Sequence, residues 1–153
     1  MTITVLQENL YPKLQEALRF IAGKPQLPIL SGIFMSAHSG EVTLRSTDLR
    51  VGFQTVLGGK VEEDGECVVP AKFLEELVGS LTQGPIVLQT KEQNLLVTQG
   101  KTKAKLTVFS SSDFPPFPSL GKEILSVNRK KLLDASFLLW KSELSWGLGL
   151  RLL

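Results

Sequence analysis

A strand–helix–three-strand pattern occurs twice along this chain, once over residues 2–57 and again over residues 66–109. The strands are indicated by alternating apolar residues between short turn-forming gaps, and the helices by apolar residues at steps of three and four. The two copies share little residue identity, but a duplication of this length is typical of a pseudo-symmetric domain. The repeat therefore predicts an α+β fold, with two helices on one face and antiparallel sheets on the other.

Each predicted helix has one apolar stripe and recognisable ends. We expect Asn9 to cap the first helix, with Pro12 in its first turn and Gly23 at its end. Pro70 has a backbone angle suited to a helix start, and it precedes the second helix. The stripes expected to face the core are Leu10, Leu14, Ala17, Leu18 and Ile21 in the first helix, and Phe73, Leu74, Leu77, Val78 and Leu81 in the second.

The remaining strands are predicted in two antiparallel meanders. Residues 30–37, 41–45 and 50–57 form the first, and residues 85–90, 94–99 and 103–109 form the second. Thr47 and Asp48 are expected to form a turn rather than a site, because an Asp side chain bonds readily to the backbone that follows it. A short strand at residues 67–69 precedes the second helix, and residues 58–65, with two glycines and several acids, are expected to interrupt the pattern.

The composition indicates a soluble domain without covalent cross-links. A chain of 153 residues with 42% hydrophobic residues can bury a core, and its single cysteine, Cys67, excludes an intrachain disulfide. Neither a leader sequence nor an apolar run of about 18 residues is found, so we expect a cytoplasmic protein without a membrane span. The net charge of +2 does not by itself indicate nucleic-acid binding, although basic and acidic residues cluster separately.

The residue combinations on which catalysis and metal binding depend do not occur. The one histidine, His38, is expected beside a hairpin turn, and Cys67 within an apolar strand is expected to be a buried, inert thiol. One His and one Cys provide no zinc-ligand spacing, and no calcium loop or glycine-rich phosphate loop is present. We therefore predict a non-enzymatic binding protein without metal or cofactor. An enzyme that uses Cys67 or His38 is the alternative, and it would require rapid labelling of the native thiol.

Residues 110–118 differ in composition from the preceding strands: three serines and an aspartate are followed by two phenylalanines and three prolines. Such a segment cannot form a regular hydrogen-bond ladder, so it is expected to run extended as a linker. A terminal tail would account for it too, but the aromatic residues favour a strap packed on the surface.

Five short stretches, in order along the chain, resemble the N-terminal domain of the DNA polymerase III beta subunit, the bacterial sliding clamp. They are residues 23–32 around Leu27-Pro28-Ile29-Leu30, Ser46–Leu49, Val68–Phe73, Ser112–Pro115 and Val127–Leu133. The resemblance implies a clamp domain over residues 1–120, followed over residues 121–153 by a linker and the start of a truncated second clamp domain with an atypical apolar tail.

In that family, domains joined head to tail close a ring around duplex DNA, with helices lining the hole and sheets outside. The resemblance implies a processivity factor that binds double-stranded DNA without sequence specificity and tethers the replicative polymerase as a homo-oligomeric ring. The helices need only form a mildly cationic wall, because the contacts must let the ring slide.

The resemblance also implies which residues meet DNA and the neighbouring subunit. Lys24 and Lys72 match basic family positions, and Lys13 and Arg19 on the first helix are further candidates; a solvated surface cation is the alternative for each. Gly79 and Ser80 depart from clamps that have lysines at this helix end. Leu106, Thr107 and Val108 match the strand edge that pairs with another subunit, with an ordinary edge inside the domain as the alternative.

Beyond Leu133 the sequence does not resemble the family. A truncation, a shifted reading frame or a deliberately shortened chain would each produce such a tail. The groove that receives polymerase and clamp-loader peptides lies between the second and third clamp domains, so no peptide site is expected here. The alternative function is therefore a non-functional or decoy fragment that acts only as a dimerisation module.

Overall fold

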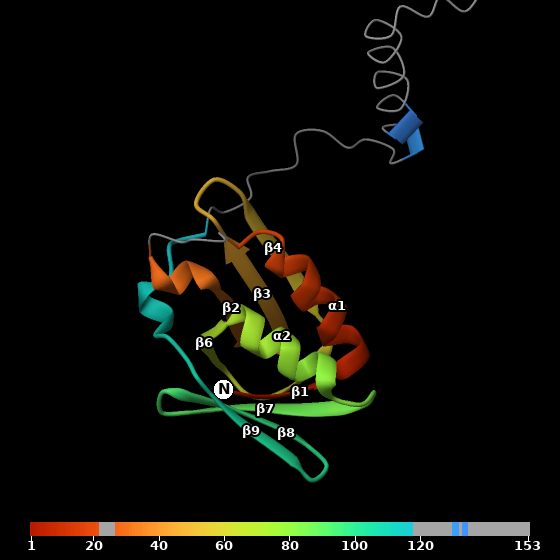
Figure 1. Cartoon of the computed structure of the whole chain (residues 1–153), viewed down its shortest axis with the longest axis vertical. Coiled ribbons are helices and arrows are strands. Elements are labelled where there is room, and N and C mark those ends of the chain that lie inside the picture. The colour runs from red at the N-terminus through yellow and green to blue at the C-terminus, as the bar shows by residue number, and fades with distance from the viewer. Residues whose placement is uncertain (22–26, 118–129, 132, 135–153) are drawn as a thin grey trace, which may run out of the picture. The chain divides into compact units, whose positions relative to one another are not determined.

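The duplicated pattern appears in the structure as two strand–helix–three-strand units (Figure 1). The computed structural model describes residues 1–21, 27–117, 130–131 and 133–134, and residues Met1–Phe117 form one unit. The first copy comprises β1 (Thr2–Leu6), α1 (Gln7–Leu18), β2 (Gly32–His38), β3 (Glu41–Thr47) and β4 (Gly52–Leu57). The second comprises β6 (Gly65–Pro70), α2 (Ala71–Ser80), β7 (Pro85–Lys91), β8 (Asn94–Gln99) and β9 (Thr102–Thr107). Strand β5 (Gly59–Glu63) and two 3-10 turns, η1 (Pro28–Ser31) and η2 (Ser111–Asp113), complete the described elements.

The two copies exchange their first strands. Strand β1 pairs antiparallel with β7 of the second copy, and β6 pairs antiparallel with β2 of the first. The result is a five-stranded sheet in the order β5-β1-β7-β8-β9 and a four-stranded sheet in the order β4-β3-β2-β6. Because each sheet contains strands from both copies, the two copies share their sheets and their core. The predicted α+β architecture, with its duplicated unit, is confirmed.

One core lies between the helices and the two sheets. The predicted helical stripes supply Leu10, Leu14 and Ala17 from α1 and Leu74 and Val78 from α2, all fully buried. Phe73, predicted to face the core, is instead 65% exposed, because it lies one position off the buried face of α2. Every second residue of the strands faces this core, as in Ile33 and Met35 of β2. None of the described helices is long and apolar enough to cross a lipid bilayer.

The prediction that Asn9 caps the first helix is wrong, because α1 begins two residues earlier, directly after β1. The loop before β7 provides the hydrogen-bond partners of the first helical turn instead. Gln7 N–H donates to the Gly84 carbonyl at 2.9 Å, and Gly84 N–H donates to the Glu8 carboxylate at 3.1 Å. Pro12 consequently lies in the second turn. The predicted end at Gly23 is wrong as well, because α1 ends at Leu18 with Arg19 as its C-terminal cap; Gly23 itself lies outside the described residues.

The predicted interruption at residues 58–65 is also wrong, because Gly59–Glu63 form β5. This strand pairs with β1, with Ile3 opposite Val61 and Val5 opposite Gly59. A Cβ on Gly59 would lie 2.7 Å from the Val5 side chain, so glycine permits the close pairing. The strand is imposed by its partner rather than by its own residues, which have low β propensity.

The turn between β3 and β4 is built as predicted. Asp48 Oδ1 accepts the N–H groups of Arg50 and Val51 at 2.9 and 2.7 Å, and the Val51 bond is the main cause of the lowered pKa of this carboxyl group. Thr47 Oγ1 donates to the Val51 carbonyl. Ser46 Oγ donates to the Ala17 carbonyl at 2.9 Å, which ties this strand end to the last turn of α1. The Ser46–Leu49 motif is therefore structural.

Candidate functional site

Helices α1 and α2 lie side by side, α1 against β3 and β4 and α2 against β2 and β6 (Figure 1). A buried bond joins them, in which Gln7 Nε2 donates to the Val78 carbonyl at 3.0 Å. The Tyr11 ring rests on Gly79, where an added Cβ would lie 2.8 Å from a ring carbon. Gly79, which departs from the lysine expected of the family, therefore has a packing role. We call the exposed side of α1, Arg19 and α2 the helix wall.

The three described cations predicted to contact DNA all belong to the helix wall, but their surroundings differ. Lys72 is exposed in the first turn of α2, and Arg19 is exposed at the C-terminal cap of α1. Lys13 is half-buried and its ammonium group lies 2.9 Å from a carboxylate oxygen of Glu16. Lys24, the first-ranked candidate, lies outside the described residues.

The helix wall is not cationic. Its described residues include three cations, Lys13, Arg19 and Lys72, against four carboxylates, Glu8, Glu16, Glu75 and Glu76. Desolvation, and then the neighbouring Glu75 carboxylate, raise the pKa of the Tyr11 hydroxyl. The expectation of a mildly cationic wall is therefore wrong for this part of the surface, and phosphate attraction would have to come largely from elsewhere.

Strand β9 forms one edge of the five-stranded sheet, and β5 forms the other. Leu106 and Val108 pack against the core while Thr107 is exposed. Strand β9 ends at Thr107, two residues before the predicted end at Phe109. Beyond it, Val108 N–H donates to the Gln93 carbonyl and Phe109 pairs with Val68 of the other sheet. Backbone groups alternate in direction along an antiparallel pair, so those of Lys103, Lys105 and Thr107 point to the open edge.

A row of lysines accompanies that edge. Lys101, Lys103 and Lys105 are exposed, and none of them forms an ion pair with any described residue. Charged side chains, lysine above all, are the usual protection of an edge strand against indiscriminate pairing.

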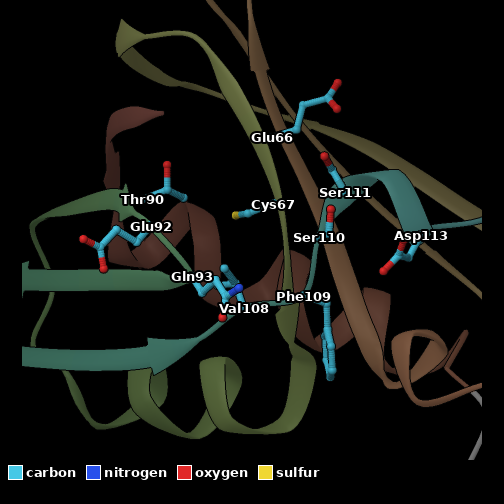
Figure 2. A pocket seen from close by; sticks show the side chains of 10 residues that line it. All are labelled: Glu66, Cys67, Thr90, Glu92, Gln93, Val108, Phe109, Ser110, Ser111 and Asp113. Carbon is cyan, nitrogen blue, oxygen red and sulfur yellow. The ribbon is translucent and has the colours of Figure 1, made fainter.

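A cavity of about 510 Å³ opens at the other end of β9 (Figure 2). Its lining is acidic and hydroxyl-bearing, with the Cys67 thiol on its wall: Glu66, Cys67, Thr90, Glu92, Gln93, Val108, Phe109, Ser110, Ser111 and Asp113. Burial raises the pKa of the Cys67 thiol to about 12, so the nucleophilic thiolate is suppressed at neutral pH.

No described residues form a nucleophile–base pair that involves this thiol. Cys67 lies opposite Met35, and His38 is three residues further along β2, about 10 Å away at 3.3 Å per residue. His38 is exposed and its Nδ1 lies 3.1 Å from Asp64 Oδ2. Among the described residues, no group of three or more His, Cys, Asp or Glu could hold a metal ion.

The family model that matches this chain is that of the DNA polymerase III beta subunit, N-terminal domain, over residues 1–118. The beta sliding clamp of Micrococcus luteus is 28% identical over 120 residues, which cover 78% of this chain and 39% of that protein. The beta sliding clamp of Escherichia coli K12 is 28% identical over 142 residues, which cover 89% of this chain and 39% of that protein.

Solved clamps share the fold. The Helicobacter pylori beta clamp bound to a DNA ligase peptide superposes with a TM-score of 0.74 at 25% identity, over 78% of this chain and 34% of that one. The DNA polymerase III subunit beta of Pseudomonas aeruginosa superposes with a TM-score of 0.73 at 29% identity, over 78% of this chain and 32% of that one. The chain thus spans 32–39% of the length of these relatives.

Proposed function

Because this chain belongs to the DNA polymerase III beta subunit family, a family of non-catalytic processivity factors, we propose that it is the N-terminal segment of a ring-shaped sliding clamp. In this role it helps to encircle duplex DNA and to tether the replicative polymerase in the cytoplasm. The observation that carries the proposal is the family match over residues 1–118, together with two helices that lie side by side and pack against the sheets.

The proposed DNA-facing residues are Lys24, Lys72, Lys13 and Arg19. Lys72 and Arg19 are exposed and unpaired among the described residues, so they can approach phosphates without breaking an ion pair. Lys13 is the weaker candidate, since Glu16 already neutralises it. With four carboxylates beside three cations, the wall would attract DNA only weakly and enclosure would supply most of the retention, which suits a ring that slides.

We propose the β9 edge, with Leu106, Thr107 and Val108, as the subunit interface. A partner strand would bond to the outward backbone groups of Lys103, Lys105 and Thr107 and continue the sheet. The three exposed lysines beside these groups select an acidic partner edge, because like charges at such a junction are repulsive. Leu106 and Val108 would support the junction from the core side.

The test is topological retention. Rings assembled with this chain and loaded on nicked circular DNA should stay bound through gel filtration at moderate salt, and linearising the DNA should release them. A ring of this kind should also lengthen the products that its cognate polymerase makes in one binding event. Equal retention on circular and linear DNA would contradict encirclement.

A second function, a decoy or dimerisation module, is favoured by the open β9 edge, which offers unpaired backbone groups to a strand of another chain. It predicts a one-to-one complex with a full-length clamp subunit in size-exclusion chromatography, together with reduced ring formation. Substitution of Lys103 and Lys105 by glutamate should abolish that complex. If the chain migrates alone at micromolar concentrations, this function is excluded.

A further inference from the structure

The outer face of the four-stranded sheet has its own apolar cluster. Phe34 points away from the main core, because it alternates with Ile33 and Met35 along β2. Around it gather Ile29, Leu30 and Val68, and Phe109 and Phe114 pack against the group. We call residues Ser110–Phe117 the strap, because this segment crosses the cluster after leaving β9.

The strap is attached at its beginning and in its middle. Phe109 N–H donates to the Val68 carbonyl at 2.8 Å, which binds the chain to β6 just before the strap begins. Phe114 N–H donates to the Ser111 carbonyl at 3.2 Å, and the Phe114 ring centroid lies 5.2 Å from that of Phe34. These contacts hold the strap over the cluster.

At its end the strap contacts the first residue of β4. A Cβ placed on Gly52 would lie 2.7 and 2.9 Å from two atoms of the Phe117 ring, so the ring occupies the space that a side chain would fill. Gly52 has no positive φ. The absence of a side chain at position 52 therefore serves the docking of Phe117 rather than the backbone conformation.

Arg45 joins the two aromatic residues. Its guanidinium carbon lies 5.6 Å from the ring centroid of Phe34 and 5.6 Å from that of Phe117. Arg45 Nε–H donates to Gln54 Oε1 at 2.9 Å, which fixes the guanidinium plane from β4. No described carboxylate pairs with Arg45, so the two rings are its main partners.

We propose that Arg45 is the positioning residue of a latch that holds the strap closed over the outer apolar cluster. When the latch opens, Phe114 and Phe117 leave the outer apolar cluster together, and the side chains of Phe34, Leu30 and Ile29 become exposed to solvent. A planar guanidinium can stack on both rings, whereas the compact ammonium of a lysine cannot. The latch does not depend on whether the chain belongs to a DNA-encircling ring.

The experiment is amide hydrogen exchange on the full chain, followed at Phe114 in the strap and at Val97, a buried position in β8. R45A and R45K should each speed exchange at Phe114 by about two- to fivefold, because the stack of Arg45 on Phe117 is the one of its two ring contacts that opening breaks, and should leave Val97 unchanged. R50A is the matched control, since Arg50 is exposed in the β3–β4 turn and touches no ring.

A second pair of variants changes the glycine on which the Phe117 ring docks. G52A should displace Phe117 and speed exchange at Phe114 in the same way, while G58A, which has open space around it, should not. Combining R45A with G52A should add little to either change, because both variants release the same Phe117 ring. The proposal is overturned if R45A behaves as R50A does, or if it speeds exchange at Val97 as much as at Phe114.

Discussion

Gly32 lies where the two copies exchange strands, and replacing it by alanine should destabilise the fold through packing alone. It is the first residue of β2 and pairs with Pro70 at the end of β6. Its backbone angles, φ −99° and ψ 162°, are open to any residue, so alanine meets no conformational penalty. An added Cβ would lie 2.5 Å from Val68 Cγ1, and 3.1 and 3.2 Å from the carbonyl oxygens of Val69 and Ile29.

The magnitude follows from two opposing terms. Overpacking in a buried site costs about 1–3 kcal/mol, and the backbone carbonyls here cannot move aside, so the upper half of that range is expected. Alanine also stiffens the unfolded chain, which offsets about 0.4–1 kcal/mol. G32A should therefore lower the free energy of unfolding by roughly 2 kcal/mol, or the Tm by about 8 °C for a unit of this size.

Urea unfolding followed by far-ultraviolet circular dichroism measures this change. G58A is the matched control: nothing lies within 4 Å of its Cβ and its φ is not positive, so it should stabilise the chain by about 0.4–1 kcal/mol. In the G32A/V68A double variant the cost should be smaller than the sum of the single costs, because the clashing methyl group is gone. Equal stability of G32A and G58A would refute the exchanged-strand geometry at this point.

Three further predictions concern the site. Cys67 should react with thiol reagents at pH 8 far more slowly in the native chain than in urea. Because folding raises the pKa of this thiol from 9.0 to about 12, its contribution to stability should be intact below pH 9 and be lost as the pH rises from there towards 12, so C67A should make the alkaline loss of stability less steep. In loaded rings, K24E and K72E should weaken DNA retention and reduce the salt slope by about 0.9 for each phosphate that is no longer neutralised, whereas K60E, whose lysine already pairs with Glu62, should change neither; unchanged retention at low salt would refute the assignment. E75Q/E76Q should strengthen retention, since it removes negative charge from the helix wall, and an unchanged value would show that the wall does not meet DNA.

The parts of the fold that could be predicted are those that local periodicity specifies. The stripe of Leu10, Leu14 and Ala17 identified α1 and its buried face, and the turn chemistry of Thr47 and Asp48 identified the β3–β4 turn. The family motifs likewise have physical roles, as with Ser46, which bonds to the last turn of α1.

The parts that could not be predicted depend on distant segments. Strand β5 has little strand character of its own and exists because β1 lies beside it, and α1 starts at Gln7 because the backbone of Gly84 replaces a side-chain cap. To predict the net charge of the helix wall, one must know which charged residues share a face. To predict the Arg45 latch, one must know that residues 34, 45 and 117 lie together. A single sequence contains no local signal for such contacts.

The central claim is that the helix wall, and not the outer face of the five-stranded sheet, lies against DNA. It is tested most directly by placing a photo-crosslinking amino acid at Phe73, which is 65% exposed on α2, or at Val87, which is 36% exposed on β7, in rings loaded on nicked circular DNA. The account predicts crosslinks to DNA from position 73 and none above background from position 87. Crosslinks from position 87 alone would contradict it.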